Sequence, residues 1–143
     1  MCKCRSGEFY GDCCQPFHNG SQIPSNPIKL VRSRYSAYAY GIVPYIMATT
    51  HPSHKEYAAE EQKSKMSLWK RNLNTYVRDY EFLDLKFIDE TRDSQVPPDA
   101  ESVTVAFQAR LQRKTMDYPV QIINELSTFL KDKKGERWLY AGE

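Results

Sequence analysis

The chain of 143 residues carries 20 basic and 18 acidic side chains, a formal net charge of +2, and its composition is 41% hydrophobic. This length suits one domain with its own core, and so small a net charge excludes overall charge as a basis for nucleic-acid binding. No apolar run approaches the length of a membrane span, and no secretory signal is visible. We therefore expect a cytoplasmic protein without membrane contact, or an organellar one if a transit peptide precedes Met1 in a longer precursor.

All four cysteines lie in the first segment, MCKCRSGEFYGDCC, with the spacing C-x-C-x8-C-C. Two disulfides are one alternative, but the adjacent Cys13 and Cys14 suit disulfide geometry poorly, and a reducing compartment opposes it. A redox dithiol is a second alternative, although no C-x-x-C pattern is present. Four thiolates suit a tetrahedral Zn²⁺ ion and leave no position open for water. The spacing therefore favours a structural zinc site made by Cys2, Cys4, Cys13 and Cys14.

The segment CKCRSGEFYGDCC resembles the SEC-C motif, C-x-C-x-S-G-x5-C-C or C-H, with Cys14 at the last ligand position. The resemblance implies a zinc knuckle at residues 1–20. Similar knuckles form the tail of the preprotein-translocating ATPase of bacteria, where they contact a chaperone and the ribosome. Because they also occur in otherwise unrelated proteins, the motif implies a metal and leaves the function open.

The first helix after this segment is expected to begin at Pro27, with Asn26 as its cap, and to end at Gly41. Arg32 and Arg34 leave this helix on different faces, so they do not converge on one phosphate. We expect one of them to be solvated and the other to be a structural arginine paired at the helix edge. The apolar residues at helical spacing are Ile28, Val31, Tyr35 and Tyr38.

Two further helices are expected before the sequence pattern changes. Pro44 can open a short second helix, and Pro52 can end it. The charged segment from residue 53 to about residue 74 is the third helix, with Glu61 and Lys65 at a favourable i,i+4 spacing. The side chains available for burial there are Tyr57, Met66 and Trp69.

The hydrophobic period then becomes two, which is typical of β-strands, with turn signals at VPPD and KKG. Helices followed by antiparallel strands predict an α+β domain, in which a strongly curved sheet wraps around the N-terminal helices and leaves a pocket. A third alternating run is PVQIINELSTFLK. The residues that alternate are Leu83, Leu85 and Phe87 in the first strand, Val103, Val105, Phe107, Ala109 and Leu111 in the second, and Trp138 and Tyr140 in the last.

These segments together resemble the YchJ-like family, which joins a SEC-C knuckle to a cone-shaped domain of the nuclear transport factor 2-like, or cystatin-like, fold. The resemblance covers nearly the whole chain and implies a cone domain at residues 26–143, but it implies no reaction. It is carried by LVRSRYSAY (30–38), Tyr45 with THPS (50–53), VTVAFQARL (103–111), and ELSTFLK followed by GERWLYAGE.

The chain departs from the family pattern at three places. Thr50 stands where a tryptophan is frequent, Asn124 stands where a histidine is frequent, and residues 82–85 replace a W-x-G-L pattern. The implied fold should survive these changes. Chemistry that depends on the tryptophan or the histidine is not implied for this chain.

The pocket of the cone is a candidate active site, because similar cones host isomerases, dehydratases and hydrolases. Glu125 shares one face of its strand with Ser127 and Phe129, so it is expected to be buried or to lie at the pocket mouth. A buried carboxylate needs a partner, and we favour a structural bridge from Arg34 or Arg32 over catalysis. General-base chemistry would otherwise fall on His51 or Glu125, although a packing role is favoured for His51. The candidate residues are His51, Glu125, Arg34, Tyr35 and Ser127.

The knuckle carries a small basic and aromatic surface made by Lys3, Arg5, Phe9 and Tyr10, of a kind that contacts peptides or single-stranded nucleic acid. The alternative is that Phe9 and Tyr10 pack onto the cone and dock the knuckle. We favour a protein-interaction module, followed by RNA or ribosome contact, and then by a small-molecule-binding or hydrolase- or isomerase-type enzyme. A homodimer through the open sheet face is a further alternative that the sequence leaves open.

Overall fold

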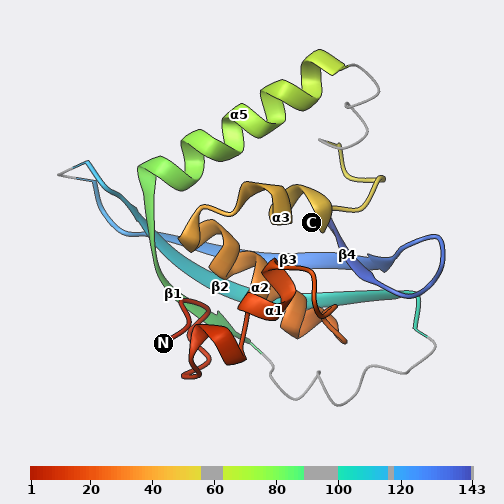
Figure 1. The fold of residues 1–143 in the computed structure, drawn as a ribbon. Coiled ribbons are helices and arrows are strands. Elements are labelled where there is room, and N and C mark those ends of the chain that lie inside the picture. The colour runs from red at the N-terminus through yellow and green to blue at the C-terminus, as the bar shows by residue number, and fades with distance from the viewer. Residues whose placement is uncertain (56–62, 89–99, 116–117, 143) are drawn as a thin grey trace.

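The computed structural model describes residues 1–55, 63–88, 100–115 and 118–142. Within them, four strands form one antiparallel sheet in the order β1-β2-β3-β4. The strands are β1 (Tyr80–Phe87), β2 (Ser102–Arg113), β3 (Gln121–Lys131) and β4 (Trp138–Gly142). Helices α2 (Pro27–Tyr40), α3 (Val43–Ala48) and α5 (Lys63–Asp79) lie over one face of this sheet (Figure 1). The predicted α+β architecture is confirmed.

Helix α2 has the boundaries that its local sequence predicts. The backbone N–H of Lys29 donates to the side-chain oxygen of Asn26 at 2.9 Å, which caps the first turn, and Pro27 opens the helix. Gly41 ends it with φ of 76°, a left-handed conformation that glycine adopts without steric strain. The buried face predicted for this helix packs against the sheet.

Helix α3 ends at Ala48, before the proline that the sequence suggests as its end. The backbone N–H of His51 donates to the carbonyl of Tyr140 in β4 at 2.7 Å, and Thr50 forms an isolated bridge with the same residue. These contacts with the sheet use the backbone groups of the segment between α3 and Pro52. The chain therefore leaves the helix before the proline is reached.

Helix α5 continues to its last residue, Asp79, beyond the predicted end near Asn74. Tyr76 and Val77 keep the helical spacing and pack against two clusters of buried residues, so the last turn has apolar contacts to hold it. Trp69 is buried, as expected. Tyr57 and Glu61 lie outside the described residues, and the side chains of Lys65 and Met66 are not described, so the predicted pairing of Glu61 with Lys65 and the burial of Tyr57 and Met66 stay predictions.

Strand β1 contains a register shift between Phe82 and Asp84, which is typical of a β-bulge. A bulge inserts one extra residue and reverses the alternation of side chains from that point. The prediction that Leu83 shares the buried face is therefore wrong, because Phe82 packs against the core in its place. Leu85 and Phe87, beyond the bulge, face the core as predicted.

The core of the molecule lies between α2 and the sheet. Strand β2 directs its predicted apolar face into this core, and Phe129 from β3 and Trp138 from β4 are buried there. Gly135 in the KKG segment adopts φ of 69° in the turn between β3 and β4, as predicted, whereas the VPPD segment lies outside the described residues. Among the described residues, none of the helices has the length and apolar character of a membrane span.

Residues 1–20, called the knuckle below, contain a 3-10 helix, η1 (Tyr10–Asp12), and a short helix, α1 (Gln15–His18). Residues 26–142 are called the cone. The knuckle lies beside α2, on the side of the molecule where β1 ends (Figure 1).

Candidate functional site

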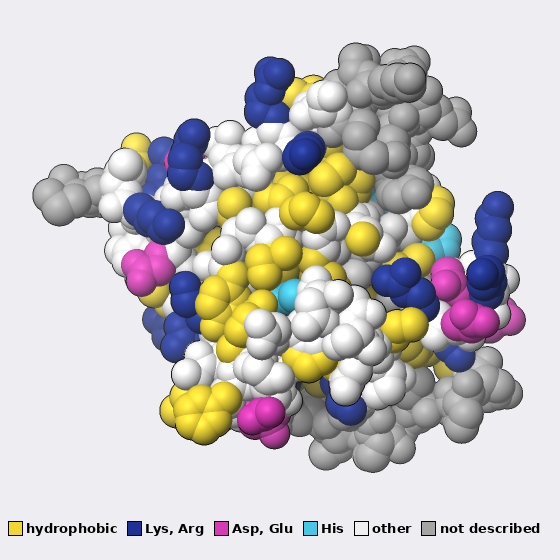
Figure 2. All heavy atoms as spheres, viewed as in Figure 1, with side chains coloured by type: hydrophobic (Ala, Val, Ile, Leu, Met, Phe, Trp, Pro, Cys, Tyr) yellow, Lys and Arg dark blue, Asp and Glu magenta, His cyan; other side chains and the backbone are white. Residues whose placement is uncertain are grey.

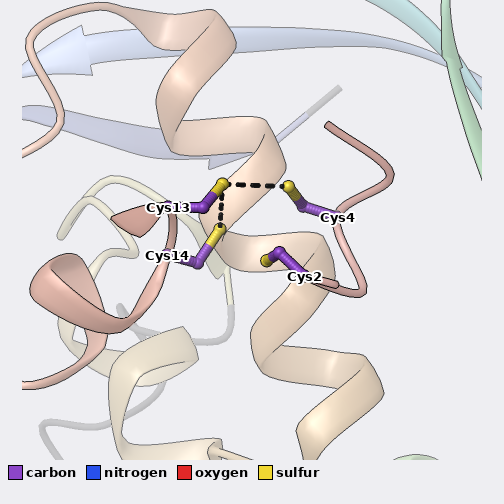
Figure 3. A group of neighbouring side chains, drawn as sticks. All are labelled: Cys2, Cys4, Cys13 and Cys14. Carbon is purple, nitrogen blue, oxygen red and sulfur yellow. Dashed lines mark hydrogen bonds between the residues drawn. The ribbon is translucent and has the colours of Figure 1, made fainter. Parts of the chain in front are cut away.

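The four cysteine sulfurs converge in the knuckle, all within 4.8 Å of one another. The Sγ of Cys13 lies 3.4 Å from that of Cys4 and 3.8 Å from that of Cys14 (Figure 3). All four are free thiols, and their separations exceed the roughly 2.05 Å of a disulfide. Cys2, Cys4 and Cys14 are buried, and Cys13 is half-buried. The cluster could therefore hold a metal ion.

The backbone between the two cysteine pairs turns sharply to bring them together. Gly7 adopts φ of 87°, and Arg5 adopts φ of 69°, which is unusual for a residue with a side chain. The guanidinium of Arg5 donates to the carbonyl of Phe82 in the cone at 3.3 Å, which holds the strained residue in place. Ser6 Oγ lies 3.2 Å from Cys13 Sγ, so the turn also contacts the sulfur cluster.

The thiols differ in their pKa values because they interact with one another. A hydrogen bond with Cys14 lowers the pKa of Cys4 to about 4. Burial raises the pKa of Cys13 to about 11, and the hydrogen bond with Cys4, with burial, raises the pKa of Cys14. Of these three thiols, Cys4 therefore loses its proton most readily, and its thiolate opposes deprotonation of Cys13 and Cys14. A cation between the sulfurs would favour deprotonation of the others.

Three of the four residues predicted to form a contact surface turn back toward the cone. The backbone N–H of Lys3 donates to the hydroxyl of Tyr40 at 3.3 Å, and its ammonium lies 4.9 Å from the centre of that ring. The ring of Tyr10 lies 4.6 Å from the ring of Tyr40. Arg5 is bonded to Phe82, as described above. These three side chains dock the knuckle, which is the alternative that the sequence left open for Tyr10.

Phe9 differs from its neighbours because 72% of its surface is exposed. It precedes η1 and is extended, with φ of −67° and ψ of 146°. A large aromatic side chain this exposed is uncommon, since burial of such a ring is worth more than that of most side chains. Phe9 is therefore an apolar part of the predicted contact surface that is available to another molecule, whereas Lys3 and Arg5 are exposed but also contact the cone.

His18 fastens the knuckle to α2, and the sequence analysis missed it. Its Nε2 lies 2.8 Å from the carbonyl of Ser33, which can only accept, so this nitrogen carries the hydrogen. Its Nδ1 then accepts from the hydroxyl of Tyr10 at 2.7 Å. Burial lowers the pKa of His18 and favours this neutral form. A single histidine in a short helix has no sequence signal for such a contact, because its partner lies in another element.

Arg32 also joins the two regions, so the expectation that one of the two arginines is simply solvated is wrong. Its Nη1 donates to the carbonyl of Cys4 at 3.2 Å, and its guanidinium carbon lies 4.9 Å from the centre of the Phe87 ring. The physical reason is that the knuckle covers this side of α2. The other arginine, Arg34, points to the opposite side and has the structural role that the sequence predicts for one of the pair.

A pocket of about 430 Å³ lies between α2, α5 and the sheet, within the size range of small-molecule sites. Figure 2 shows hydrophobic side chains gathered below α5 on the face of the molecule that is in view. The candidates Arg34, Tyr35 and Glu125 line the pocket, whereas Ser127 is buried and is not part of the lining. The aromatic residues of the lining are Tyr35, Tyr38, Trp69, Tyr76, Phe82, Phe107, Phe129 and Tyr140.

The polar side of this pocket combines a cation, a hydroxyl and a carboxylate. Arg34 is 8% exposed, and its Nη1 donates to the carbonyl of Ile46 at 2.9 Å. The carboxylate of Glu125 accepts from the hydroxyl of Ser127 at 2.8 Å. Burial raises the pKa of the Tyr38 hydroxyl, which lies in the fields of both Arg34 and Glu125. The predicted bridge between Arg34 and Glu125 stays a prediction, although both side chains line one pocket.

The two histidines after α3 differ in position. His51 lies in the turn, where its Nδ1 accepts from the backbone N–H of Ser53 at 3.0 Å, and it is not part of the pocket lining. His54 lines the pocket, with its ring 5.4 Å from that of Tyr140. His51 was a candidate from the sequence, whereas His54 was not. The turn-forming HPS segment was the available signal, because it carries the chain from one histidine back toward the sheet.

The fold and the cysteine cluster define a class of protein, an α+β cone of the nuclear transport factor 2-like fold that carries an N-terminal cysteine knuckle. Residues 26–142 match the family described as "YchJ, middle NTF2-like domain". The chain belongs to this YchJ-like family, as its sequence motifs predict.

Relatives with similar sequences are UPF0225 proteins. The protein SG1365 of Sodalis glossinidius is 32% identical over 144 residues, which cover 98% of this chain and 80% of the relative. PC1_1977 of Pectobacterium carotovorum is 31% identical over 139 residues, covering 97% and 79%. A UPF0225 protein of Serratia proteamaculans is 50% identical over 52 residues, which are 36% of this chain and 34% of that relative's length.

Two solved structures share the arrangement of the whole chain. The solution structure of RPA3114, a SEC-C motif containing protein from Rhodopseudomonas palustris, has a TM-score of 0.71 and 29% identity, covering 97% of this chain and 94% of that one. The crystal structure of a SEC-C motif containing protein from Psychrobacter arcticus has a TM-score of 0.68 and 26% identity, covering 93% and 70%. The similarity extends over the knuckle as well as the cone.

Proposed function

We propose that the four cysteines hold one structural Zn²⁺ ion and that the knuckle so formed is an interaction module carried by the cone. The observation that carries this proposal is the convergence of four sulfurs within 4.8 Å. Four ligands at about 2.3 Å around a tetrahedral Zn²⁺ lie roughly 3.8 Å from one another, so the donor set fits the ion. Four thiolates close its coordination, and the ion therefore stabilises the knuckle and takes no part in a reaction.

The buried residues of the knuckle support a need for this ion. Its buried cluster consists of cysteines, with Tyr10 packed against them, and so offers little apolar surface to stabilise a fold. Zn²⁺ would supply the charge that lets all four thiols deprotonate. Free thiols of this kind fit a reducing compartment, which supports a cytoplasmic location.

Phe9 is the contact that we propose for a protein partner. Its ring is exposed, whereas Lys3, Arg5 and Tyr10 are bonded to the cone. A partner with an apolar pocket would bury this ring, and aromatic anchors of this kind dominate the energy of many interfaces. A protein partner is therefore favoured over RNA at the knuckle, because the basic side chains there already have intramolecular partners.

The zinc proposal is tested by metal analysis of the purified protein. We expect about one equivalent of zinc to copurify, since the four thiolates complete one tetrahedral site. Replacement of Cys13 or Cys14 by serine should remove it. Replacement of the exposed Ser25 by alanine, outside the knuckle, should leave the zinc content unchanged. Reduced protein that contains no metal and keeps an ordered knuckle would contradict the proposal.

The partner proposal is tested by mass spectrometry of proteins that copurify with the chain. Phe9→Ala should lose the specific partner while the cone stays folded and the zinc stays bound. Ile23→Ala is the matched control, because Ile23 is also an exposed apolar side chain but lies after the knuckle. A partner that survives Phe9→Ala excludes the proposed contact and leaves the zinc proposal intact.

The pocket supports a second candidate function, a small-molecule site. The buried Arg34 and the carboxylate of Glu125 supply a few polar groups among aromatic walls, which is the usual composition of such sites. If the site is that of an isomerase or hydrolase, Glu125 is the candidate base, with His54 on the same lining.

A panel of small aromatic acids and their neutral amides tests this second candidate through thermal shifts. We expect an acid to raise the melting temperature more than its amide does, because Arg34 offers a cation in the pocket. Ile123→Trp should remove the shift by filling the pocket, whereas Ile122→Trp, an exposed neighbour outside the lining, should not. Equal shifts in both variants would exclude the pocket as the binding site.

A further inference from the structure

Helix α5 has two unlike faces. Trp69 and Leu73 turn toward the pocket, whereas the other face is exposed and lines a shallow groove on the surface. The groove consists of Ser67, Lys70, Arg71, Asn74, Thr75 and Arg78. These residues recur at helical spacing, so three cations lie along one face of the helix over about 12 Å, from the rise of roughly 1.5 Å per residue.

The end of β2 continues this basic surface beyond the helix. The backbone N–H of Lys114 donates to the carbonyl of Asp79, the last residue of α5, at 2.9 Å. The guanidinium carbon of Arg113 lies 5.7 Å from the centre of the Tyr80 ring and 5.1 Å from that of Tyr118. Tyr118 is 49% exposed, so part of this group of arginine and aromatic rings is accessible to another molecule. We call this surface the basic face; it consists of Lys70, Arg71, Arg78, Arg113, Lys114 and Tyr118.

Charge is concentrated on the basic face. It carries five cations, and its acidic neighbour among the described residues is Asp79, whose carboxylate lies 2.9 Å from Arg78. Glu81 points to the other face of the sheet, because side chains alternate along a strand and Tyr80 packs on the helix side. The whole chain has a net charge of only +2, so the rest of the molecule does not share this excess. Figure 2 shows lysine and arginine side chains along α5.

The combination of cations with an exposed ring indicates the kind of partner. A row of cations fits the phosphates of a nucleic acid, and an aromatic ring beside an arginine fits an unstacked base. A membrane surface fits less well, because Trp69, Leu73 and Tyr76 of α5 line the pocket. Leu68 is then the exposed apolar side chain that the structure describes on this helix, and one such side chain offers little for insertion. In the cytoplasmic compartment expected for this chain, RNA is the abundant single strand.

We propose that the basic face binds single-stranded RNA, with its lysines and arginines on the phosphates and Tyr118 stacked on a base. This surface is separate from the cysteine cluster, from Phe9 and from the pocket. A negative result for the zinc ion or for a protein partner at the knuckle would therefore leave this proposal unaffected. It also moves RNA contact, which the sequence analysis placed at the knuckle, to α5 and the end of β2.

The test is fluorescence anisotropy of the full, zinc-loaded chain with a labelled RNA of about 12 nucleotides and mixed sequence. With roughly four phosphates contacted, we expect the affinity to fall about 50-fold between 50 mM and 200 mM salt. Single-stranded DNA of the same sequence should bind no more tightly than the RNA. Absence of RNA binding at the lower salt, or preference for DNA, overturns the proposal.

Two triple variants separate the basic face from net charge. K70Q/R71Q/R78Q should weaken RNA binding by at least about tenfold, because three phosphate contacts are lost. K29Q/K133Q/K134Q removes the same charge from exposed residues elsewhere and should change the affinity by less than about twofold, since distant exposed charges are screened. Circular dichroism is the control that both variants fold. Equal losses in the two variants would assign the binding to net charge and overturn the proposal.

A pair of substitutions at Tyr118 tests the stacking contact. Tyr118→Ala should weaken RNA binding at least about fivefold, whereas Tyr118→Phe, which keeps the ring, should not. An unchanged affinity for Tyr118→Ala overturns the stacking contact. Two further probes are vesicles that contain phosphatidylserine and, separately, a polyglutamate peptide. Tighter binding of the vesicles or of the peptide than of RNA overturns the assignment to RNA.

Discussion

The knuckle and the cone are stabilised in different ways. The cone buries a continuous apolar cluster from α2 and all four strands, including Leu30, Leu111 and Phe129. The knuckle buries cysteines. It meets α2 through polar and ring contacts, such as those of His18 and Arg32, and Phe17 packs against the small buried cluster that contains Ala37. The difference teaches that the cone can hold its shape through its own core, whereas the knuckle has docking contacts and, in our proposal, a metal ion to hold its shape.

Removal of the zinc ion that we propose should have the largest effect and should act on the knuckle alone. Structural zinc in small domains contributes about 10–16 kcal/mol of binding free energy at neutral pH, which a chelator would remove. We expect the amide resonances of residues 1–20 to lose their dispersion in two-dimensional NMR spectra, while those of residues 26–142 keep theirs. Addition of Zn²⁺ should restore the spectrum. Collapse of the whole spectrum would show that the two regions are not independent.

Truncation of the core should act on the cone. Phe129→Ala removes a side chain that is 1% exposed and should lower the free energy of unfolding by about 3–5 kcal/mol, measured by urea denaturation. Leu126→Ala is the matched control on the same strand, because Leu126 is 57% exposed, and it should change stability by no more than about 0.5 kcal/mol. Similar losses in the two variants would mean that the outer face of the sheet is also buried in solution.

The docking contact should have a smaller effect. Tyr10→Phe removes the hydroxyl that donates to Nδ1 of His18 and should cost about 1 kcal/mol in the free energy of unfolding. It should also increase hydrogen exchange in the knuckle. Tyr118→Phe, at an exposed tyrosine, is the control and should leave both quantities unchanged. An unaltered exchange rate in Tyr10→Phe would mean that this hydrogen bond does not help to hold His18 in its contact with the Ser33 carbonyl of α2.

Acidification should weaken the docking contact that His18 makes, and this effect should be the smallest of those predicted here. The pKa of His18 is lowered below its ordinary value of 6.5 by burial, so the unfolded chain takes up this proton before the folded chain does. The contribution of neutral His18 to the free energy of unfolding should therefore be fully present above pH 6.5 and should decrease as the pH falls below that value. His18→Gln should remove this component of the pH dependence, seen as a flatter profile of the free energy of unfolding. Identical profiles for the two proteins would contradict it.

Local signals predicted much of the fold. Asn26 and Gly41 mark the ends of α2 because capping depends on a few neighbouring residues, and the alternation along β2 predicted its buried face correctly. The cysteine spacing predicted the cluster for a similar reason, since one short loop carries all four thiols. Glu125 also faces the pocket as its strand position predicts.

Features that depend on distant contacts were not predictable in this way. The bulge in β1 displaces Leu83 from the core, and it is a property of the pairing with β2. His54 lines the pocket only because the segment after α3 is bonded to β4. Arg32 has its partner in the knuckle, far away in the sequence.

The sequence by itself determined the element types, the cysteine cluster and the family, because each depends on short-range spacing or on motifs along the chain. The tertiary structure alone decided which knuckle residues are available to a partner, and it brought the cations of α5 beside Arg113 and Tyr118. The physical reason is that docking engages the hydrogen-bond donors and aromatic rings of the side chains that come into contact. Packing between elements decides which side chains these are, and it leaves no periodic signal in the chain.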